Sequence, residues 1–327
     1  MRFSDFSLKS SKSIGVEICP QGIFFAFMKK KAGVPFLERA AFSPFQSSFL
    51  EGANFSPFQS GVLKPSLRET NILDPQAFCD CLKEVHSLFP SKEPRLSVSL
   101  PDAVGRIFLM DIEGRFKSRG EAMDVIRWKL KKSVSFNTND AHLDYQQLMI
   151  RENNEMSLLV TMVSRNIITQ YEDLIISAGF LPVYIDLNVF SLFRTFENHP
   201  VVQRDVALIL YYKGSLAIVV MNGGIPEFIR IKDITESTAN GHRVYREICN
   251  SFMAYRERFP ERAPNKLFCV AEPGTINNFC EMVAEATGSE TSPLKIETMV
   301  KPQKDPSSDQ QTLFSYTAAI GAALRNL

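Results

Sequence analysis

The sequence IGVEICPQGIFFAFM, residues 14–28, decides how the first half of the chain folds. Two apolar runs, 14–18 and 23–28, flank the turn signal Pro20-Gln21-Gly22. Short apolar runs on either side of a turn predict two buried strands paired as a hairpin. A third run at 36–42 extends the predicted hairpin to three strands.

The second half of the chain repeats this plan. Three runs, 206–212, 216–221 and 228–231, are separated by the tight turns Lys213-Gly214-Ser215 and Asn222-Gly223-Gly224. In each half, three strands, a helix, a strand and a helix follow in the same order, about 190 residues apart by apolar periodicity. The duplication predicts an α/β fold of two related lobes, with ligands binding in a central cleft.

We expect the first lobe to span residues 1–203 and the second to span 204–327, with the C-terminal helix packing back towards the first lobe. Strand patterns and an amphipathic helix at about 95–165 predict a subdomain inserted in the first lobe. The segment 43–74 is rich in Ser, Pro and Gly and predicts a long surface loop.

This loop contains a short duplication. Phe-Ser-Pro-Phe-Gln-Ser occurs at 42–47 and again at 55–60. Two interpretations stay open: phenylalanines that pack onto the body of the protein, or a segment that docks a partner.

The bulk composition excludes several classes of protein. Lys and Arg number 37 against 36 Asp and Glu, a balance that argues against a nucleic-acid-binding protein. The longest apolar runs are strand-sized, whereas a spanning helix needs about 20 apolar residues. The N-terminus lacks the apolar core of a signal peptide. We therefore expect a cytoplasmic protein.

The sequence predicts no metal site. Cys79 and Cys81 are the only close cysteine pair, and on a helix their side chains point to different faces. The four histidines are scattered without ligand spacing. We expect all six cysteines to be free thiols that behave as small hydrophobic groups.

Five stretches, in one order along the chain, resemble motifs of the PilM family of type IV pilus assembly proteins, which are actin-like relatives of FtsA. They are SLPD at 99–102, IRWKL with VSFN at 126–137, LDYQ at 143–146, SAGFLP continuing to the arginine at 177–194, and AIGAALR at 319–325. The resemblance implies an actin-like (ribonuclease H-like) fold.

The resemblance also implies a function and partners. PilM-like proteins are cytoplasmic scaffolds of the inner-membrane platform that assembles the pilus, and they reach the membrane only through partners. The implied partner is the cytoplasmic N-terminal segment of a PilN-like membrane protein, with the pilus motor ATPases as further candidates. Two alternatives stay open: a nucleotide-binding actin-like ATPase, and the cytoplasmic domain of an L-type protein of type II secretion.

The first phosphate-binding motif of the family is altered in this chain. Glu17 keeps an acid and Gly22 keeps a glycine, but Cys19 replaces a glycine and Phe24 replaces a lysine. Glycines let backbone N–H groups approach phosphate oxygens closely, so their loss weakens such a site. We interpret Glu17 as a solvated or hairpin-capping acid rather than a magnesium ligand.

The other two nucleotide motifs are altered as well. Leu210 and Tyr212 stand where the family has Asp-Ile-Gly, just before Gly214, and the adenosine loop reads Ala271-Glu272-Pro273-Gly274 instead of a run of glycines. Losses of this kind remove several kcal/mol of transition-state stabilisation. We therefore predict a pseudo-ATPase with no catalytic residue, no ATP and no magnesium.

A partner peptide in extended form needs an apolar groove. Our predicted groove walls are 96–109 and 125–136 in the first lobe. The residues proposed to line the groove are Leu100, Ile107, Ile126, Trp128 and Phe136.

Overall fold

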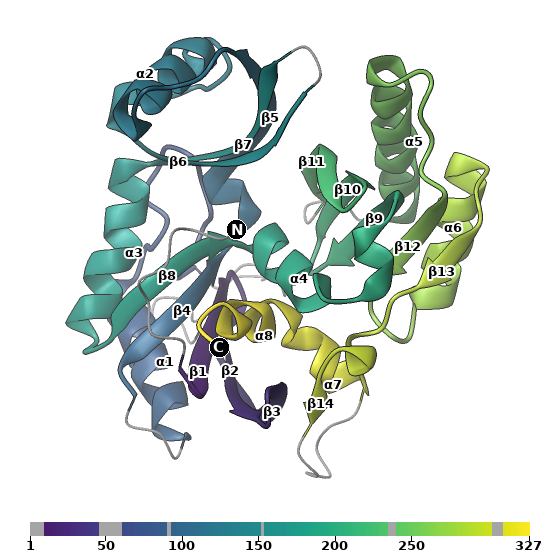
Figure 1. Ribbon diagram of the computed structural model, residues 1–327. Helices are drawn as coiled ribbons and strands as arrows, with labels where there is room; N and C mark the ends of the chain where they lie inside the picture. Colours follow the sequence, from purple (N-terminus) through teal and green to yellow (C-terminus); the bar gives the residue numbers. More distant parts are fainter. Residues whose placement is uncertain (1–9, 46–60, 90–92, 152–153, 235–239, 303–309) are drawn as a thin grey trace. The chain divides into compact units, whose positions relative to one another are not determined.

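The computed structural model forms two compact units, Met1–Ser191 with Ala318–Leu327, and Leu192–Thr317. It describes residues 10–45, 61–89, 93–151, 154–234, 240–302 and 310–327 (Figure 1). The chain passes from one unit to the other within helix α4 (Asn188–Phe196) and returns at the start of helix α8 (Thr317–Leu324). The end of the chain is therefore part of the first unit.

The main sheet of the first unit is built on the hairpin that the opening sequence predicts. Strands β1 (Lys12–Cys19), β2 (Gly22–Lys31) and β3 (Val34–Pro44) are antiparallel neighbours. Strands β4 (Arg95–Leu100) and β8 (Leu181–Leu187) continue the sheet in parallel from β1. The resulting order is β3-β2-β1-β4-β8.

Two helices of this unit begin and end at residues that the sequence signals. In α1 (Pro75–Ser87), the Asp74 side chain accepts a hydrogen bond from the Ala77 N–H at 3.0 Å, and proline occupies the first turn. Helix α3 (Arg165–Ser177) is followed by Gly179 with φ of 94°, as expected of a C′ glycine. Helix α1 packs against β2 and β3, and α3 packs against β8.

A smaller three-stranded sheet is inserted after β4. It consists of β5 (Gly105–Glu113), β6 (Ala141–Ile150) and β7 (Glu155–Ser164) in the antiparallel order β5-β7-β6. Helix α2 (Arg119–Leu130) covers one face of this sheet (Figure 1). Its buried residues are Ala122, Ile126 and Leu130.

The second unit has the same sheet topology as the first. Strands β9 (Val206–Tyr212), β10 (Ser215–Asn222) and β11 (Ile225–Asp233) are antiparallel, and β12 (Lys266–Val270) and β13 (Thr291–Pro293) run parallel to β9. The order β11-β10-β9-β12-β13 corresponds strand for strand to β3-β2-β1-β4-β8. The predicted duplication of an α/β plan is confirmed.

Two helices pack together in the second unit, α5 (Asn240–Arg258) and α6 (Ile276–Thr287). Their inner faces share one core with β9, β10 and β12, in which Ile248, Phe252 and Val283 are buried. The remaining short elements are β14 (Lys301–Pro302), α7 (Gln310–Ser315) and the 3-10 turns Asp102–Val104, Thr138–Asp140, Pro200–Gln203 and Ile296–Thr298.

The prediction of a surface loop over 43–74 is wrong for its C-terminal part. Val62, Leu63 and Ile72 are buried, and Leu63 forms an antiparallel bridge with Ile72. The buried Asn71 donates to the carbonyl oxygens of residues 66 and 69 at 2.9 Å each, which satisfies the backbone of the bend. Three apolar residues and one buried amide thus anchor the segment 61–74, whose other residues are exposed or half-buried.

Only part of the hexapeptide duplication lies within the described residues. In the first copy, Phe45 is buried and its ring lies 6.2 Å from that of Phe78 on α1. The second copy, 55–60, lies outside the described residues.

All six cysteines are free thiols, and five of them are buried. Burial raises the pKa of Cys81 to about 11, and the nearby Glu84 acts in the same direction while a hydrogen bond with Ser43 opposes it. A thiol with such a pKa stays protonated at neutral pH and is a poor nucleophile.

The C-terminal helix approaches β1 at Gly15 more closely than a side chain would allow. A Cβ atom on Gly15 would lie 1.9 Å from the carbonyl oxygen of Ala319 and 2.4 Å from the amide nitrogen of Ala323. Residues 317–323 of α8 are all buried, and apart from Ile320 they are small: Thr317, Ala318, Ala319, Gly321, Ala322 and Ala323. The Ser10 N–H also donates to the carbonyl oxygen of Asn326 at 3.1 Å. Small residues on both sides therefore hold the chain end on the first sheet.

Replacement of Gly15 by alanine should destabilise the protein strongly. The new methyl group would meet backbone atoms, which cannot move aside as a side chain could, so we expect a loss of about 3 kcal/mol or more in the free energy of unfolding. Urea denaturation followed by circular dichroism measures this loss.

Gly274→Ala is the matched control, because a Cβ atom at Gly274 meets nothing within 4 Å. Equal stability of the two variants would contradict the close packing of α8 on β1.

Candidate functional site

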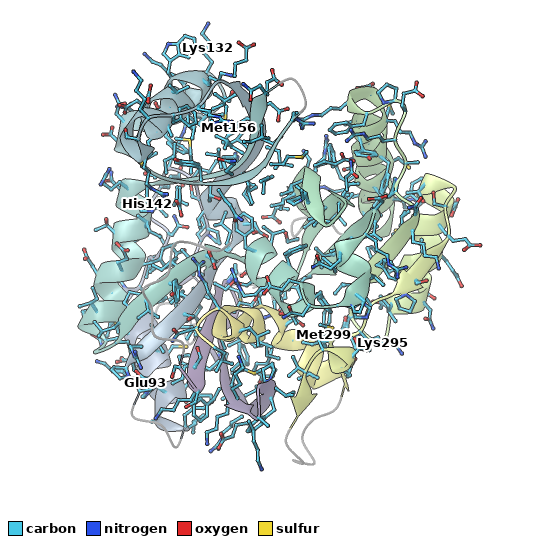
Figure 2. All side chains as sticks on the ribbon, viewed as in Figure 1. Glu93, Lys132, His142, Met156, Lys295 and Met299 are labelled. Atoms are coloured by element: carbon cyan, nitrogen blue, oxygen red, sulfur yellow. The ribbon has the colours of Figure 1, made fainter. Side chains whose placement is uncertain are left out.

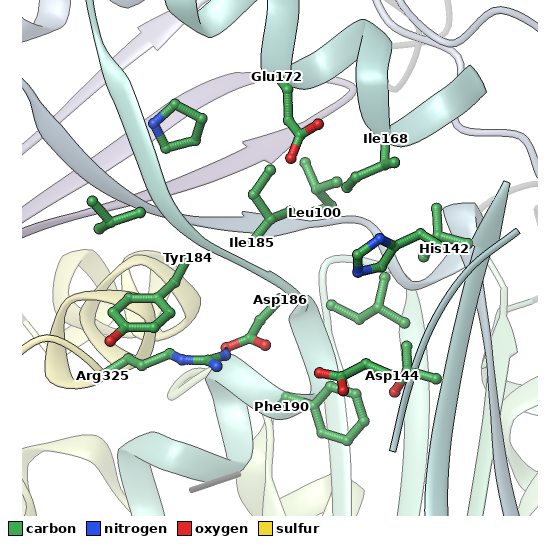
Figure 3. A pocket seen from close by; sticks show the side chains of 15 residues that line it. Leu100, His142, Asp144, Ile168, Glu172, Tyr184, Ile185, Asp186, Phe190 and Arg325 are labelled. Carbon is green, nitrogen blue, oxygen red and sulfur yellow. Dashed lines mark hydrogen bonds and ion pairs between the residues drawn. The ribbon is translucent and has the colours of Figure 1, made fainter. Parts of the chain in front are cut away.

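The first unit carries a pocket of about 290 Å³ along the edge of its main sheet (Figure 3). Six consecutive residues, 182–187 of β8, line the pocket, so both faces of this strand contribute. Among the described strands, β8 pairs with β4 alone and forms the edge of the sheet. The other walls come from α3, β6, β7, the start of α4 and the chain end.

A buried ion pair forms one end of this pocket. The Arg325 guanidinium forms an ion pair with the Asp186 carboxylate, and each side chain is only 8% exposed. The guanidinium also lies over the ring of Tyr184, 4.4 Å from its centroid (Figure 3). Arg325 is in this position because α8 is held on β1.

The remaining polar lining is acidic. Asp144 of β6 pairs with Arg119, and its pKa is raised by burial although Arg119 opposes that shift. Glu172 of α3 projects into the pocket from another wall, and among the described residues no ion pair holds it (Figure 3). His142 lies beside Asp144 on β6. Asp144 and Asp186 each pair with an arginine, so Glu172 is the lining carboxylate that, within the described residues, is left to attract a cationic group.

Most of the remaining lining is apolar. A pocket with apolar walls and a few convergent charged groups is suited to a ligand that has both characters. The apolar lining residues are Leu100, Val163, Ile168, Pro182, Val183, Ile185, Leu187 and Phe190.

The structure does not gather the predicted groove residues in one place. Leu100 lines the pocket, whereas Ile126 is fully buried on the inner face of α2 and Trp128 is 75% exposed on the outer face of that helix. Ile107 and Phe136 are half-buried and do not line the pocket.

Sequence reasoning missed His142, Glu172 and Asp186, although Asp186 and Arg325 lie within stretches that resembled the family. An acid in β8 and a basic residue at the chain end were visible signals, but nothing in the sequence paired them.

Glu17, the acid of the first altered nucleotide motif, is fully buried, so the prediction of a solvated acid is wrong. It lies beside Ser99 in the parallel register of β1 and β4, and Ser99 donates to the Asn188 side chain at 2.6 Å. Ser99 and Asn188 are themselves buried, so the ends of these strands are covered by the start of α4.

The turn after Glu17 is tight and closed by its own contacts. Pro20 and Gln21 form a two-residue connection between β1 and β2, and the Cys19 thiol donates to the carbonyl oxygen of Gly22 at 3.3 Å. Phe24, which stands where the family has lysine, stacks on Phe42 at 4.2 Å. Proline offers no N–H, so this turn presents few donors to a phosphate.

The corresponding turn of the second unit, Lys213-Gly214, follows the aromatic residue Tyr212. Lys213 and Gly214 both have positive φ, 48° and 80°, as in a type I′ hairpin turn. Tyr212 is buried, and its hydroxyl donates to the carbonyl oxygen of Ser315 at 2.8 Å. Leu210 is also buried. No carboxylate therefore occupies the position of the family's aspartate.

The third motif lies before α6. Ala271 is buried and Glu272 is exposed. Gly274 comes just before Thr275, the N-cap residue of α6. The Thr275 N–H donates to the carbonyl oxygen of Glu272 at 2.9 Å, so the turn uses one of its own donors. No cluster of three or more His, Cys, Asp or Glu side chains suited to a metal occurs in the part of the chain that the structure describes.

The comparisons with known proteins identify the fold. No protein-family model and no curated protein matches the chain by sequence. Among solved structures, the chain is similar to one described as the PilM-PilN type IV pilus biogenesis complex, with 15% identity, a TM-score of 0.76, and coverage of 98% of this chain and 99% of the other.

A second similar structure is the cytoplasmic domain of EpsL, an inner membrane component of the type II secretion system of Vibrio cholerae. It has 11% identity, a TM-score of 0.50 and 94% coverage of both chains. A Bacteroides thetaiotaomicron protein with an actin-like ATPase fold is 7% identical, with a TM-score of 0.48 and coverage of 90% and 93%.

The predicted fold class is therefore confirmed, and this chain has the actin-like α/β fold. Within the described residues, no helix has both the length and the apolar character needed to cross a membrane.

The ion pair in the pocket supports a prediction. Arg325→Met should lower the free energy of unfolding by about 3 to 5 kcal/mol, because it leaves the Asp186 carboxylate buried without its cation. Thermal unfolding followed by circular dichroism measures the effect.

The double variant Arg325→Met with Asp186→Asn serves as the control, because it removes both charges and should recover much of the loss. If Arg325→Met alone leaves the melting temperature unchanged, the ion pair with Asp186 does not contribute to stability.

Proposed function

We propose that this chain is a PilM-like scaffold of a pilus assembly platform at the cytoplasmic face of the inner membrane, and that its pocket binds a segment of a PilN-like membrane protein. The observation that carries the proposal is a full-length likeness to the structure of a PilM-PilN complex, combined with a pocket whose lining suits a peptide. The similarity by itself concerns the fold.

The pocket suits an extended peptide because it follows a strand. A ligand lying along β8 can place alternate side chains against Ile185, Leu187 and Phe190, and a lysine, arginine or α-amino group against Glu172. Its volume of about 290 Å³ lies at the lower end of the range for ligand pockets, so it accepts a short segment.

Side chains hold the peptide more than backbone hydrogen bonds do. Pro182 has no N–H to offer. Val183 forms a β-bulge, because Leu96 of β4 pairs with Pro182 and the next residue of β4, Ser97, pairs with Tyr184. A proline and a bulge both protect an edge strand against pairing with another strand. Specificity therefore comes from the apolar wall and from the acids.

The chain acts as a scaffold rather than an ATPase. The family's phosphate-binding glycine and lysine are replaced by Cys19 and Phe24, and Leu210 stands at the aspartate position of the second motif. The side chains that replace these groups pack and hydrogen-bond within the protein. Each loss weakens stabilisation of a phosphoryl-transfer transition state. The pilus motor ATPases are further partners that would supply the energy such a scaffold lacks.

The likeness to the EpsL cytoplasmic domain supports a second candidate, a scaffold of a type II secretion system. It is the weaker candidate, because its TM-score of 0.50 is well below 0.76. The two candidates predict different membrane partners, one from a pilus system and one from a type II secretion system. A test of which partner's peptide binds therefore distinguishes them.

Isothermal titration with a synthetic peptide from the cytoplasmic N-terminal segment of a PilN-like protein should show saturable binding. Glu172→Lys should weaken that binding about tenfold, equivalent to ~1.4 kcal/mol. The new lysine would repel the cationic group that the peptide places against Glu172.

Glu281→Lys, which makes the same charge change on the exposed surface of α6, should bind as the unaltered chain does. The proposal fails if the unaltered chain does not bind at high micromolar peptide, or if the two variants weaken binding equally.

Millimolar Mg-ATP should leave the melting temperature unchanged. A ligand present at 100 times its dissociation constant stabilises a protein by about 2.7 kcal/mol, which a thermal-shift measurement detects readily. A concentration-dependent rise that Lys213→Ala abolishes would instead support a nucleotide-binding protein, since Lys213 is the basic residue of the second turn.

A further inference from the structure

Helix α2 carries a large apolar side chain on its solvent face. Trp128, the single tryptophan of the chain, is 75% exposed. Ile126 and Leu130, its neighbours two positions away, are buried against the small sheet, so Trp128 points away from the core of this subdomain. An indole in this position contributes nothing to packing within the unit.

Basic residues surround this tryptophan in the sequence. From Val125 to Asn139 the chain has four basic residues, Arg127, Lys129, Lys131 and Lys132, and no acidic one. The two acids of α2, Glu121 and Asp124, lie closer to the start of the helix, and the Glu121 carboxylate accepts from the Lys117 N–H at 2.6 Å.

The structure separates these basic groups by role. The Arg127 guanidinium is turned inward and donates to the carbonyl oxygens of Thr138 and Ala141, and the Lys129 ammonium donates to that of Asp111. Lys131 and Lys132 are exposed, and among the described residues no ion pair neutralises them.

The two lysines and Trp128 form one surface. Lys131 and Lys132 follow Trp128 by three and four positions, the spacing that places residues beside each other around a helix end. Figure 2 shows Lys132 at the outer end of the subdomain. We call Trp128, Lys131 and Lys132 the Trp128 patch.

We propose that the Trp128 patch docks on the surface of an anionic lipid bilayer. Tryptophan favours the boundary between headgroups and acyl chains, where its ring is in an apolar layer and its N–H meets polar groups. Exposed lysines beside it are attracted to anionic headgroups. Asp124 and Glu121, one and two turns before Trp128 on α2, are also exposed, so the cationic part of this surface is its C-terminal end, at Lys131 and Lys132.

This direct contact goes beyond the proposed function, in which the membrane is reached only through a partner. It also does not depend on that function, since lipid vesicles alone test it. The patch and the pocket belong to the same unit, so both contacts can be made by one body.

The single tryptophan provides the readout. The full chain is titrated with vesicles of phosphatidylcholine mixed with phosphatidylglycerol, and separately with vesicles of phosphatidylcholine alone. Trp128 emission should shift to shorter wavelength with the anionic vesicles only, because the indole leaves water, and added salt should reverse the shift. Each basic residue near an anionic surface raises the affinity about fivefold. Lys131→Glu combined with Lys132→Glu should therefore weaken vesicle binding about 25-fold or more.

The control is Lys266→Glu with Lys295→Glu, which makes the same charge change at exposed positions of the second unit and should leave vesicle binding unchanged. Co-sedimentation of Trp128→Ala with anionic vesicles measures the part of binding that the indole provides, and we expect a clear loss. No emission shift with anionic vesicles, or equal losses in the two double lysine variants, overturns the proposal. A shift caused by duplex DNA or by a protein partner but not by vesicles overturns it as well.

Discussion

The contact between Gly15 and the C-terminal helix is the constraint on which the first unit depends. Because Gly15 has no side chain, the backbone of α8 lies directly against β1, and small residues of α8 complete that contact. This packing brings the chain end back to the unit where the chain began. It places Arg325 next to Asp186 and Tyr184, residues far from it in the sequence. One wall of the pocket therefore exists because two backbones can touch at one glycine.

The two units share one sheet order and also share a packed turn after the first strand. In each, the hairpin turns that face the end of the first strand occupy the positions where actin-like proteins hold phosphate, but here those turns are filled by Cys19, Phe24 and Tyr212. The Cys19 thiol bonds across its turn, Phe24 stacks on Phe42 of β3, and the Tyr212 hydroxyl donates to the carbonyl oxygen of Ser315 at the end of α7. In the function proposed for this chain, these packed side chains replace groups that would bind a polyphosphate, as suits a protein that holds partners together.

The binding features lie instead in the first unit and its inserted subdomain. The edge of β8, helix α3 and strand β6 create an acidic and apolar pocket, and the outer face of α2 carries Trp128, with the exposed Lys131 and Lys132 directly after the helix. These surfaces have opposite charge. An acidic pocket and a basic patch on one body can bind a cationic peptide and an anionic surface at the same time, because neither ligand competes for the other's site. The insertion thus contributes to both proposed contacts.

The sequence by itself determined the duplicated strand plan, the helix limits at Asp74 and Gly179, and the alteration of the phosphate motifs, because these depend on periodicity, capping and residue identity over a few positions. It did not determine the burial of Glu17, the burial of Val62 and Ile72, or the exposure of Trp128. It also did not reveal the pocket, whose residues come from β6, α3, β8 and the chain end. Burial and charge pairing depend on which segments meet in space, and only the tertiary structure decided that Arg325 meets Asp186 while Trp128 meets solvent.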